Sequence, residues 1–168
     1  MLFIVFSIVS FYKSPKFTSL FLFLSAVSIA AAVANFTTYF FPWDEQFHAL
    51  VGKNLAENPL FPKLYPSNPL GLKSSIWADS VIWLHKQPLF MWQMALSIKL
   101  FGNTVFAVRF PSVIFHGLLV VSVYRIGVLI LDRNVGFIAA LLVMHSTFLL
   151  GLLSGRIGTD HNDFVFLG

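Results

Sequence analysis

The sequence contains no cysteine and very little charge. Without thiols, the 168-residue chain forms neither a disulfide framework nor a thiolate metal site, and its redox compartment cannot be inferred. Charged residues make up 11% of the chain, against about 25% in an ordinary soluble domain, and 57% is hydrophobic. The basic residues are scattered rather than gathered in a stripe, which argues against nucleic-acid binding. This composition predicts an integral membrane protein.

Three apolar runs are long enough to cross a bilayer, which needs about 20 residues. They cover residues 17–41, 105–131 and 135–153. The last two are joined by the polar turn Asp132-Arg133-Asn134, which predicts an antiparallel hairpin. Residues 1–12 are too short to span and are either an interfacial segment or the remainder of a longer sequence upstream.

The end of the chain turns apolar again at residues 164–167, as at the start of a fourth span. We therefore interpret residues 1–168 as the N-terminal part of one larger transmembrane domain. The predicted fold class is an all-α polytopic membrane protein with three transmembrane helices, the start of a fourth, and amphipathic juxtamembrane helices in a long outer loop, residues 42–104.

Basic residues predict the orientation of the spans. Lys13 and Lys16 precede the first span and Arg133 lies in the hairpin turn, so both places are expected to be cytoplasmic. The loop 42–104 carries lysines too, but long loops are translocated largely regardless of charge. The rule therefore places this loop outside.

Three crossings would bring distant acidic residues to the same outer face. Asp44 and Glu45 follow the first span, and Asp160 follows the third. Carboxylates that converge at a wet pocket can serve as a general base or bind a divalent cation. The simpler interpretation of Asp44 and Glu45 is a favourable helix start, because carboxylates suit the N-terminal amides. The spacing is not in itself a metal signature.

The outer loop contains two predicted helices. From Trp43, apolar residues recur with helical spacing as far as Leu55, and Asp44, Glu45 and His48 fall on or near the opposite face. The second helix should begin at a proline, residue 88, and end at a glycine, residue 102. It is short for a span and is expected to lie in the membrane interface.

Lys86 and Arg156 could each bind a phosphate, and a third basic residue, Arg109, has other possible roles. Lys86, preceded by His85, stands just before the second outer helix, where a lysine and a helix N-terminus together suit an anion. Arg109 lies just inside the second span, where it could neutralise a carboxylate or anchor the interface. Arg156 follows the third span. Contact with lipid headgroups is the simpler role for Lys86 and Arg156.

At these residues the chain resembles the polyprenol-phosphate-dependent membrane glycosyltransferases of the C-type fold, in the superfamily of protein O-mannosyltransferases and lipid A aminoarabinose transferases. The resemblance covers residues 17–168. It rests on Trp43-Asp44-Glu45-Gln46-Phe47, on His85-Lys86-Gln87-Pro88-Leu89-Phe90-Met91-Trp92, on residues 99–111 and on Gly155-Arg156-Ile157-Gly158-Thr159-Asp160. Gln87 and Gly158 depart from the pattern, where a proline and often a basic residue are expected.

The resemblance implies an enzyme of the cell envelope in the bacterial inner membrane, with its active site facing the periplasm or exterior. Its donor would be a sugar on a polyprenyl phosphate and its acceptor a lipid or protein hydroxyl. Asp44, Glu45 and Asp160 would form the catalytic site. Lys86, with His85, Arg109 and Arg156, would bind the donor phosphate. No cofactor is certain, but a divalent metal cation at Asp44 and Asp160 is an open alternative.

Two other classes of function compete with the glycosyltransferase. The first is a transporter or flippase of a lipid-linked sugar, and the second is a non-catalytic membrane subunit. Transporters place ionisable groups and broken helices near the bilayer midplane. The carboxylates here lie outside the predicted spans, which favours the enzyme.

Overall fold

The computed structural model describes residues 2–12, 14–41, 44–65, 81–84, 86 and 88–151. Over these residues the protein is helical, without a β-strand apart from one isolated bridge between Lys63 and Ile82. The helices are α1 (Leu2–Phe11), α2 (Pro15–Ala34), α3 (Asp44–Glu57), α4 (Pro88–Phe101), α5 (Val105–Ile130), α6 (Arg133–Met144) and α7 (Thr147–Leu149). The all-helical fold class is therefore confirmed for the described part of the chain.

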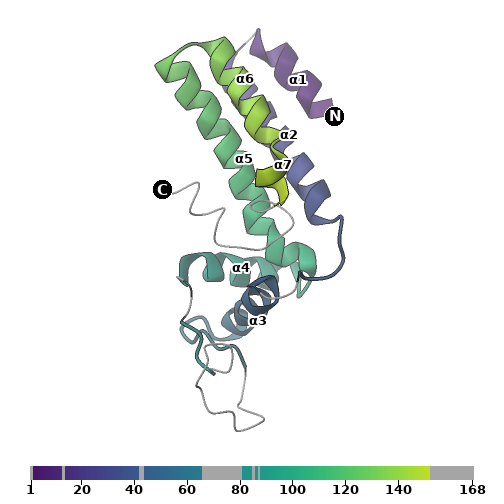
Figure 1. Ribbon diagram of the computed structural model, residues 1–168, viewed down its shortest axis with the longest axis vertical. Helices are drawn as coiled ribbons and strands as arrows, with labels where there is room; N and C mark the ends of the chain where they lie inside the picture. Colours follow the sequence, from purple (N-terminus) through teal and green to yellow (C-terminus); the bar gives the residue numbers. More distant parts are fainter. Residues whose placement is uncertain are drawn as a thin grey trace.

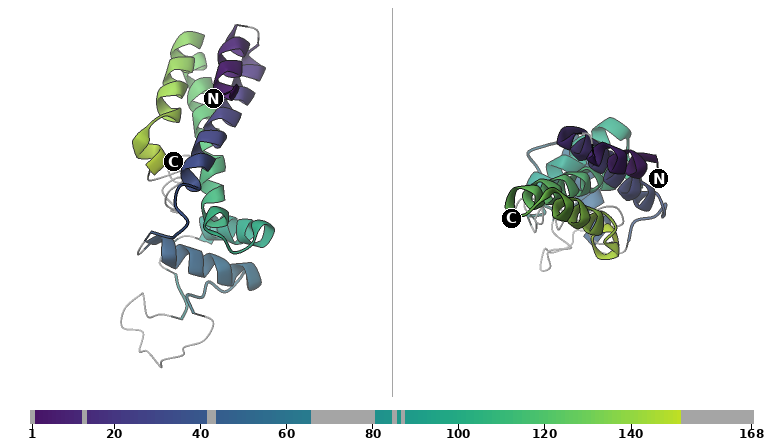
Figure 2. Two further views of the ribbon diagram at one scale, coloured as in Figure 1. Left: turned by 90° about the vertical axis from the view of Figure 1, so that its right-hand side faces the viewer. Right: turned by 90° about the horizontal axis from the view of Figure 1, so that it is seen from above.

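Helices α2, α5 and α6 form an elongated bundle, and α3 and α4 lie across one end of it (Figure 1). The α5–α6 turn is at the opposite end of the bundle, and α1 runs back along α2 from that end (Figure 2). The rings of Phe6 in α1 and Phe21 in α2 stack with centroids 5.4 Å apart. Helix α1 thus packs along the bundle rather than across its end.

Two helices have the length and composition of membrane spans, Lys16–Ala34 and Val105–Ile130. The predicted third span is not one continuous helix, because α6 ends at Met144 and the short α7 begins after His145 and Ser146. A count of three spans is therefore not established by helix length.

The first span ends at Ala34 rather than at residue 41. Asn35 is the C-cap: its backbone N–H makes a last helical hydrogen bond to the carbonyl of Ala31 at 3.1 Å, and its side-chain Nδ2 donates to the same carbonyl at 2.8 Å. The segment 35–41 is then an irregular connection that leads to α3. The apolar run was therefore a poor guide to this helix end, since hydropathy does not register a capping asparagine.

The hairpin of α5 and α6 is packed backbone to backbone. A Cβ added at Gly127 would lie 2.5 Å from the Cα of Gly136, so only glycine fits at this crossing. Close approach of small residues is a common source of packing energy between membrane helices. Asp132 begins α6 as its N-cap and accepts hydrogen bonds from the amides of Asn134 and Val135, at 2.7 and 2.9 Å. The predicted antiparallel hairpin is confirmed.

Helices α3 and α4 pack on each other through an apolar cluster that includes Val51, Leu55, Met91 and Met94. The predicted bounds of α4 agree with the structure, and Gly102 follows it with a positive φ of 80°. This φ favours glycine because it lacks a Cβ.

The predicted outward face of α3 was wrong for two residues, since Glu45 and His48 are both buried, with 1% exposure. The His48 ring packs edge-on against Trp83 and Phe90, with centroids 5.6 and 5.1 Å away. Glu45 is buried by an ion pair that is described below.

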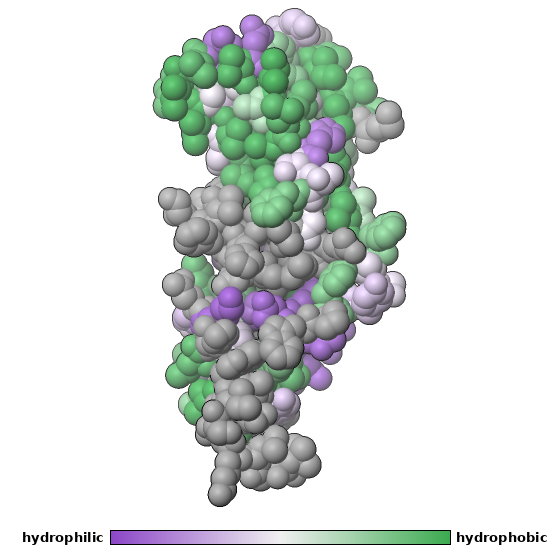
Figure 3. All heavy atoms as spheres, in the orientation of Figure 1, coloured by the Kyte–Doolittle hydropathy of each residue, from purple (hydrophilic) through white to green (hydrophobic). Residues whose placement is uncertain are grey.

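The surface follows this arrangement. Hydrophobic residues dominate the face of the bundle in Figure 3, and hydrophilic residues gather at its far end and in a band at the level of α3 and α4. Exposed apolar side chains on α5 and α6, such as Leu129 at 85% and Leu142 at 70%, suit contact with lipid.

The glycine crossing gives a first prediction. Gly127→Ala and Gly136→Ala should each lower the unfolding free energy by about 1–3 kcal/mol, because the added methyl meets backbone that has no room to yield. Thermal unfolding of the purified protein in detergent measures the change. Gly52→Ala is the matched control, since its Cβ would meet Ile98 and Met94 at an ordinary 3.4 Å. Wild-type melting of Gly127→Ala would contradict the packing.

Candidate functional site

The junction between the bundle and the outer helices is organised by Arg109. This residue lies in the first turns of α5, and its side chain and that of Glu45 are both 0% exposed. The Nε of Arg109 donates to Oε1 of Glu45 at 2.7 Å, and Nη2 donates to Oε2 at 3.1 Å. This two-point contact is the geometry in which arginine binds a carboxylate most strongly.

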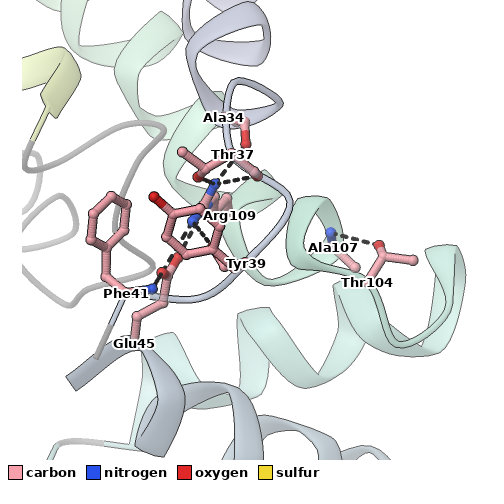
Figure 4. Close-up of polar contacts among 8 residues, drawn as sticks. All are labelled: Ala34, Thr37, Tyr39, Phe41, Glu45, Thr104, Ala107 and Arg109. Atoms are coloured by element: carbon pink, nitrogen blue, oxygen red, sulfur yellow. Dashed lines mark hydrogen bonds and ion pairs between the residues drawn. The ribbon is translucent and has the colours of Figure 1, made fainter. Parts of the chain in front are cut away.

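The rest of the guanidinium binds the connection between α2 and α3 (Figure 4). Nη1 donates to the carbonyl of Ala34 at 2.8 Å and to Oγ1 and the carbonyl of Thr37 at 2.9 and 3.2 Å. Nη2 also donates to the carbonyl of Tyr39 at 3.1 Å. All three guanidinium nitrogens thus donate hydrogen bonds to protein groups, so the N–H donors of Arg109 have acceptors.

Glu45 is equally well satisfied. Besides Arg109, its Oε2 accepts the amide of Phe41 at 2.6 Å. A charge buried at the end of a span is costly unless it is paired and hydrogen-bonded, and both conditions hold for this pair. The interpretation that Arg109 neutralises one of the carboxylates is therefore correct. We use the name Arg109 clamp for Arg109, Glu45 and the three residues whose carbonyls Arg109 binds, which are Ala34, Thr37 and Tyr39.

Asp44 stands in a different environment from its neighbour. It is the first residue of α3 and is partly exposed, and its carboxylate forms no hydrogen bond or ion pair with the described residues. The clamp fixes Glu45, so it also fixes the first turn of α3 and the backbone of Asp44. The structure thus holds an accessible carboxylate in a set position at one end of the bundle.

The predicted phosphate-binding residues are only partly placed. Lys86 is partly buried and lies just before α4, which begins at Pro88. His85, Arg156 and Asp160 lie outside the described residues, so their approach to Asp44 stays a prediction. Phosphate binding by Arg109 also stays a prediction, although its nitrogens already donate to Glu45 and to carbonyls of the clamp.

No group of three or more metal-ligating side chains occurs in the described part of the chain. The metal site suggested for Asp44 and Asp160 needs a residue outside that part and stays a prediction.

The clamp residues Ala34, Thr37 and Tyr39 were not expected from the sequence. They contribute mainly backbone carbonyls, which leave no signature in side-chain chemistry. The useful signal was Arg109 itself, because an arginine just inside a span needs a partner.

Over the described residues the fold is helical, with two helices that have the length and composition of membrane spans and two helices that lie across one end of the bundle. Residues 85–167 match the family described as dolichyl-phosphate-mannose-protein mannosyltransferase. This match covers about half of the chain and confirms the predicted membrane glycosyltransferase family. The family indicates a mannosyltransferase-type glycosyltransferase, with a lipid-linked sugar as donor and an acceptor in a membrane context. No curated protein and no solved structure gave a significant match.

The clamp gives a second prediction. Arg109→Leu should lower the unfolding free energy by about 3–5 kcal/mol, because it leaves Glu45 buried without its counter-charge. Arg109→Lys should also be destabilised, since an ammonium does not reproduce the planar fork. Both are measured by thermal unfolding. Arg125→Leu, at an exposed arginine on the same helix, is the control and should change stability by less than about 0.5 kcal/mol.

A double variant tests the coupling. Arg109→Leu combined with Glu45→Gln should be more stable than Arg109→Leu alone, because the unpaired charge is gone. Simple addition of the two single effects would contradict the clamp.

Proposed function

We propose that the protein is a glycosyltransferase that moves a sugar from a polyprenyl-phosphate donor to a hydroxyl of a lipid or protein acceptor, with Asp44 as general base. The observation that carries the proposal is the contrast between two adjacent carboxylates. Glu45 is buried and paired, while Asp44 is partly exposed and unpaired among the described residues. A base must reach the proton that it abstracts, so Asp44 suits this role and Glu45 does not.

The proposed reaction is a single displacement. Asp44 accepts the proton of the acceptor hydroxyl while the hydroxyl oxygen attacks the anomeric carbon of the sugar. The bond from that carbon to the phosphate oxygen breaks on the opposite side, so the configuration inverts. The polyprenyl phosphate leaves with the bonding electrons and gains negative charge, which a nearby cation stabilises.

Lys86 is the cation that we assign to the donor phosphate. It precedes the N-terminus of α4, where backbone amides and the helix dipole also favour an anion. His85 and Arg156 are proposed to assist it, and Asp160 to complete the acidic site, with or without a divalent cation. Arg109 serves this site through the position of Glu45 and Asp44.

The membrane arrangement belongs to the same proposal. Helices α6 and α7 together would make a third crossing, and the end of the bundle that carries α3 and α4 would face the periplasm or exterior. Arg133 supports this orientation, because it lies at the other end, with its guanidinium 4.7 Å from the ring centroid of Phe11. Basic residues at that end suit the cytoplasmic face of a bacterial inner membrane.

The test of the function uses membranes that contain the full-length protein and a panel of labelled polyprenyl-phosphate sugars. Asp44→Asn should lower donor turnover by about 10²–10⁴-fold, the usual contribution of a general base, at unchanged abundance in the membrane. Asp132→Asn is the matched control, because it makes the same change at the far end of the bundle and keeps a good helix cap.

Two outcomes would contradict the proposal. Equal turnover by wild type and Asp44→Asn would remove Asp44 from the mechanism. Movement of the donor between leaflets without its consumption, in both proteins, would favour a transporter or flippase.

The role of Lys86 gives a separate prediction. Lys86→Gln should raise the KM for the donor and lower kcat, with kcat/KM reduced by about 10–100-fold in total, since a hydrogen bond to a charged group contributes about 1.5–3 kcal/mol. Steady-state kinetics at varied donor concentration measures this change. Lys99→Gln, at the exposed C-terminal end of the same helix, should leave KM unchanged. Equal effects of the two variants would contradict the role of Lys86, because they would show that either lysine only attracts the anionic donor to the membrane surface.

A further inference from the structure

The apolar run after α5 is interrupted partway. The N–H of His145 donates to the carbonyl of Leu141 at 3.2 Å and ends α6, and Ser146 then caps α7 by accepting the amide of Leu149 at 3.4 Å. At about 1.5 Å per residue, α6 alone is much shorter than the roughly 30 Å hydrocarbon core. Non-helical backbone at membrane depth is tolerated where it is buried in protein or lines a cavity.

A pocket of about 470 Å³ lies beside this interruption, within the usual range of about 300–1,000 Å³ for small-molecule sites. It lies between the end of α2 and α7, which are close together in Figures 1 and 2. Its main lining residues are Ala32, Val33, Phe36, Thr37, Thr147 and Leu150.

The lining selects the chemistry of the occupant. Among the described residues that line the pocket none is charged, and their polar side chains are two threonine hydroxyls. A phosphate or a sugar would lose more hydrogen bonds with water than these groups could replace. A hydrocarbon chain loses nothing polar and gains by burial of its surface.

The pocket is continuous with the Arg109 clamp. Thr37 lines the pocket, and its Oγ1 and carbonyl accept hydrogen bonds from Nη1 of Arg109. The same guanidinium binds Glu45, the neighbour of Asp44. An apolar chain in the pocket therefore lies next to the part of the molecule that fixes the candidate base.

We propose that this pocket holds the isoprenoid chain of the donor, in the part that follows the phosphate. The inference rests on the proposed function, because it takes the polyprenyl-phosphate donor from it. Beyond the interruption at His145 and Ser146, α7 contributes Thr147 to the lining, and the end of α2 contributes Ala32 and Val33.

A substitution that fills the pocket tests this assignment. A Cβ at Gly151, which also lines the pocket, would meet no atom of the described residues within 4 Å, so Gly151→Phe adds volume without a clash with them at its first carbon. It should raise the KM for the long-chain donor about tenfold or more, because the chain loses buried methylenes. The KM for an analogue with a methyl group in place of the chain should stay within about twofold. Leu142→Phe, on the exposed face of α6, is the control.

Two kinetic results would overturn the inference. The first is an unchanged KM for the long-chain donor in Gly151→Phe. The second is an equal rise for the long-chain donor and for the methyl analogue, which would show a general distortion of the site.

A second measurement does not depend on activity. A photoreactive benzoylphenylalanine in place of Val33 is irradiated in vesicles that contain labelled polyprenyl phosphate and phospholipid. We expect a labelled adduct that unlabelled polyprenyl phosphate competes away. Adducts only with phospholipid, with another copy or with another part of this chain would overturn the inference. If wild type consumes no donor at all, the proposed function fails, and this adduct alone decides what fills the pocket.

Discussion

The ion pair between Arg109 and Glu45 is the interaction on which the rest of the junction depends. It joins the start of the second long span, α5, to the start of α3. The same guanidinium holds the carbonyl of Ala34 at the end of α2 and the loop at Thr37. One side chain of α5 therefore fixes the end of α2 and the start of α3, which lie 75 and 64 residues earlier in the sequence. Without it, α3 and α4 would still pack on Ala107 and Val108 of α5, but the irregular connection from α2 to α3 would lose the side chain that holds it.

This constraint explains why two adjacent carboxylates stand in different environments. Neighbouring residues in a helix point in directions about 100° apart, so a helix that buries Glu45 turns Asp44 away from the same partner. Burial of the Glu45 carboxylate costs free energy, which the ion pair with Arg109 offsets. The partly exposed residue keeps a free carboxylate at a place that the ion pair determines. The sequence alone does not distinguish the two acidic residues. In the structure, Glu45 has a structural role and Asp44 is the candidate general base.

The sequence predicted the features that depend on local pattern and failed where tertiary contacts decide. Helix α4 was correctly bounded by a proline and a glycine, and the hairpin by a polar turn at Asp132. Burial of Glu45 was missed, because its partner lies 64 residues away and hydropathy places any glutamate outside. The end of α2 was missed because one asparagine cap overrides a continuing apolar run. Asp160, the other half of the expected site, lies outside the described residues and stays a prediction.

The interrupted helix at His145 is the feature that a transporter would also use, since transporters bind ions and substrates at broken helices near the midplane. Such sites gather charged or carbonyl ligands around the substrate. Here the described pocket beside the break is lined by apolar residues and two threonines, without a charged group. The described carboxylates nearest to it, Asp44 and Glu45, stand at the end of the bundle instead. Because the described carboxylates stand at that end and not at the broken helix, the arrangement favours a transferase over a carrier.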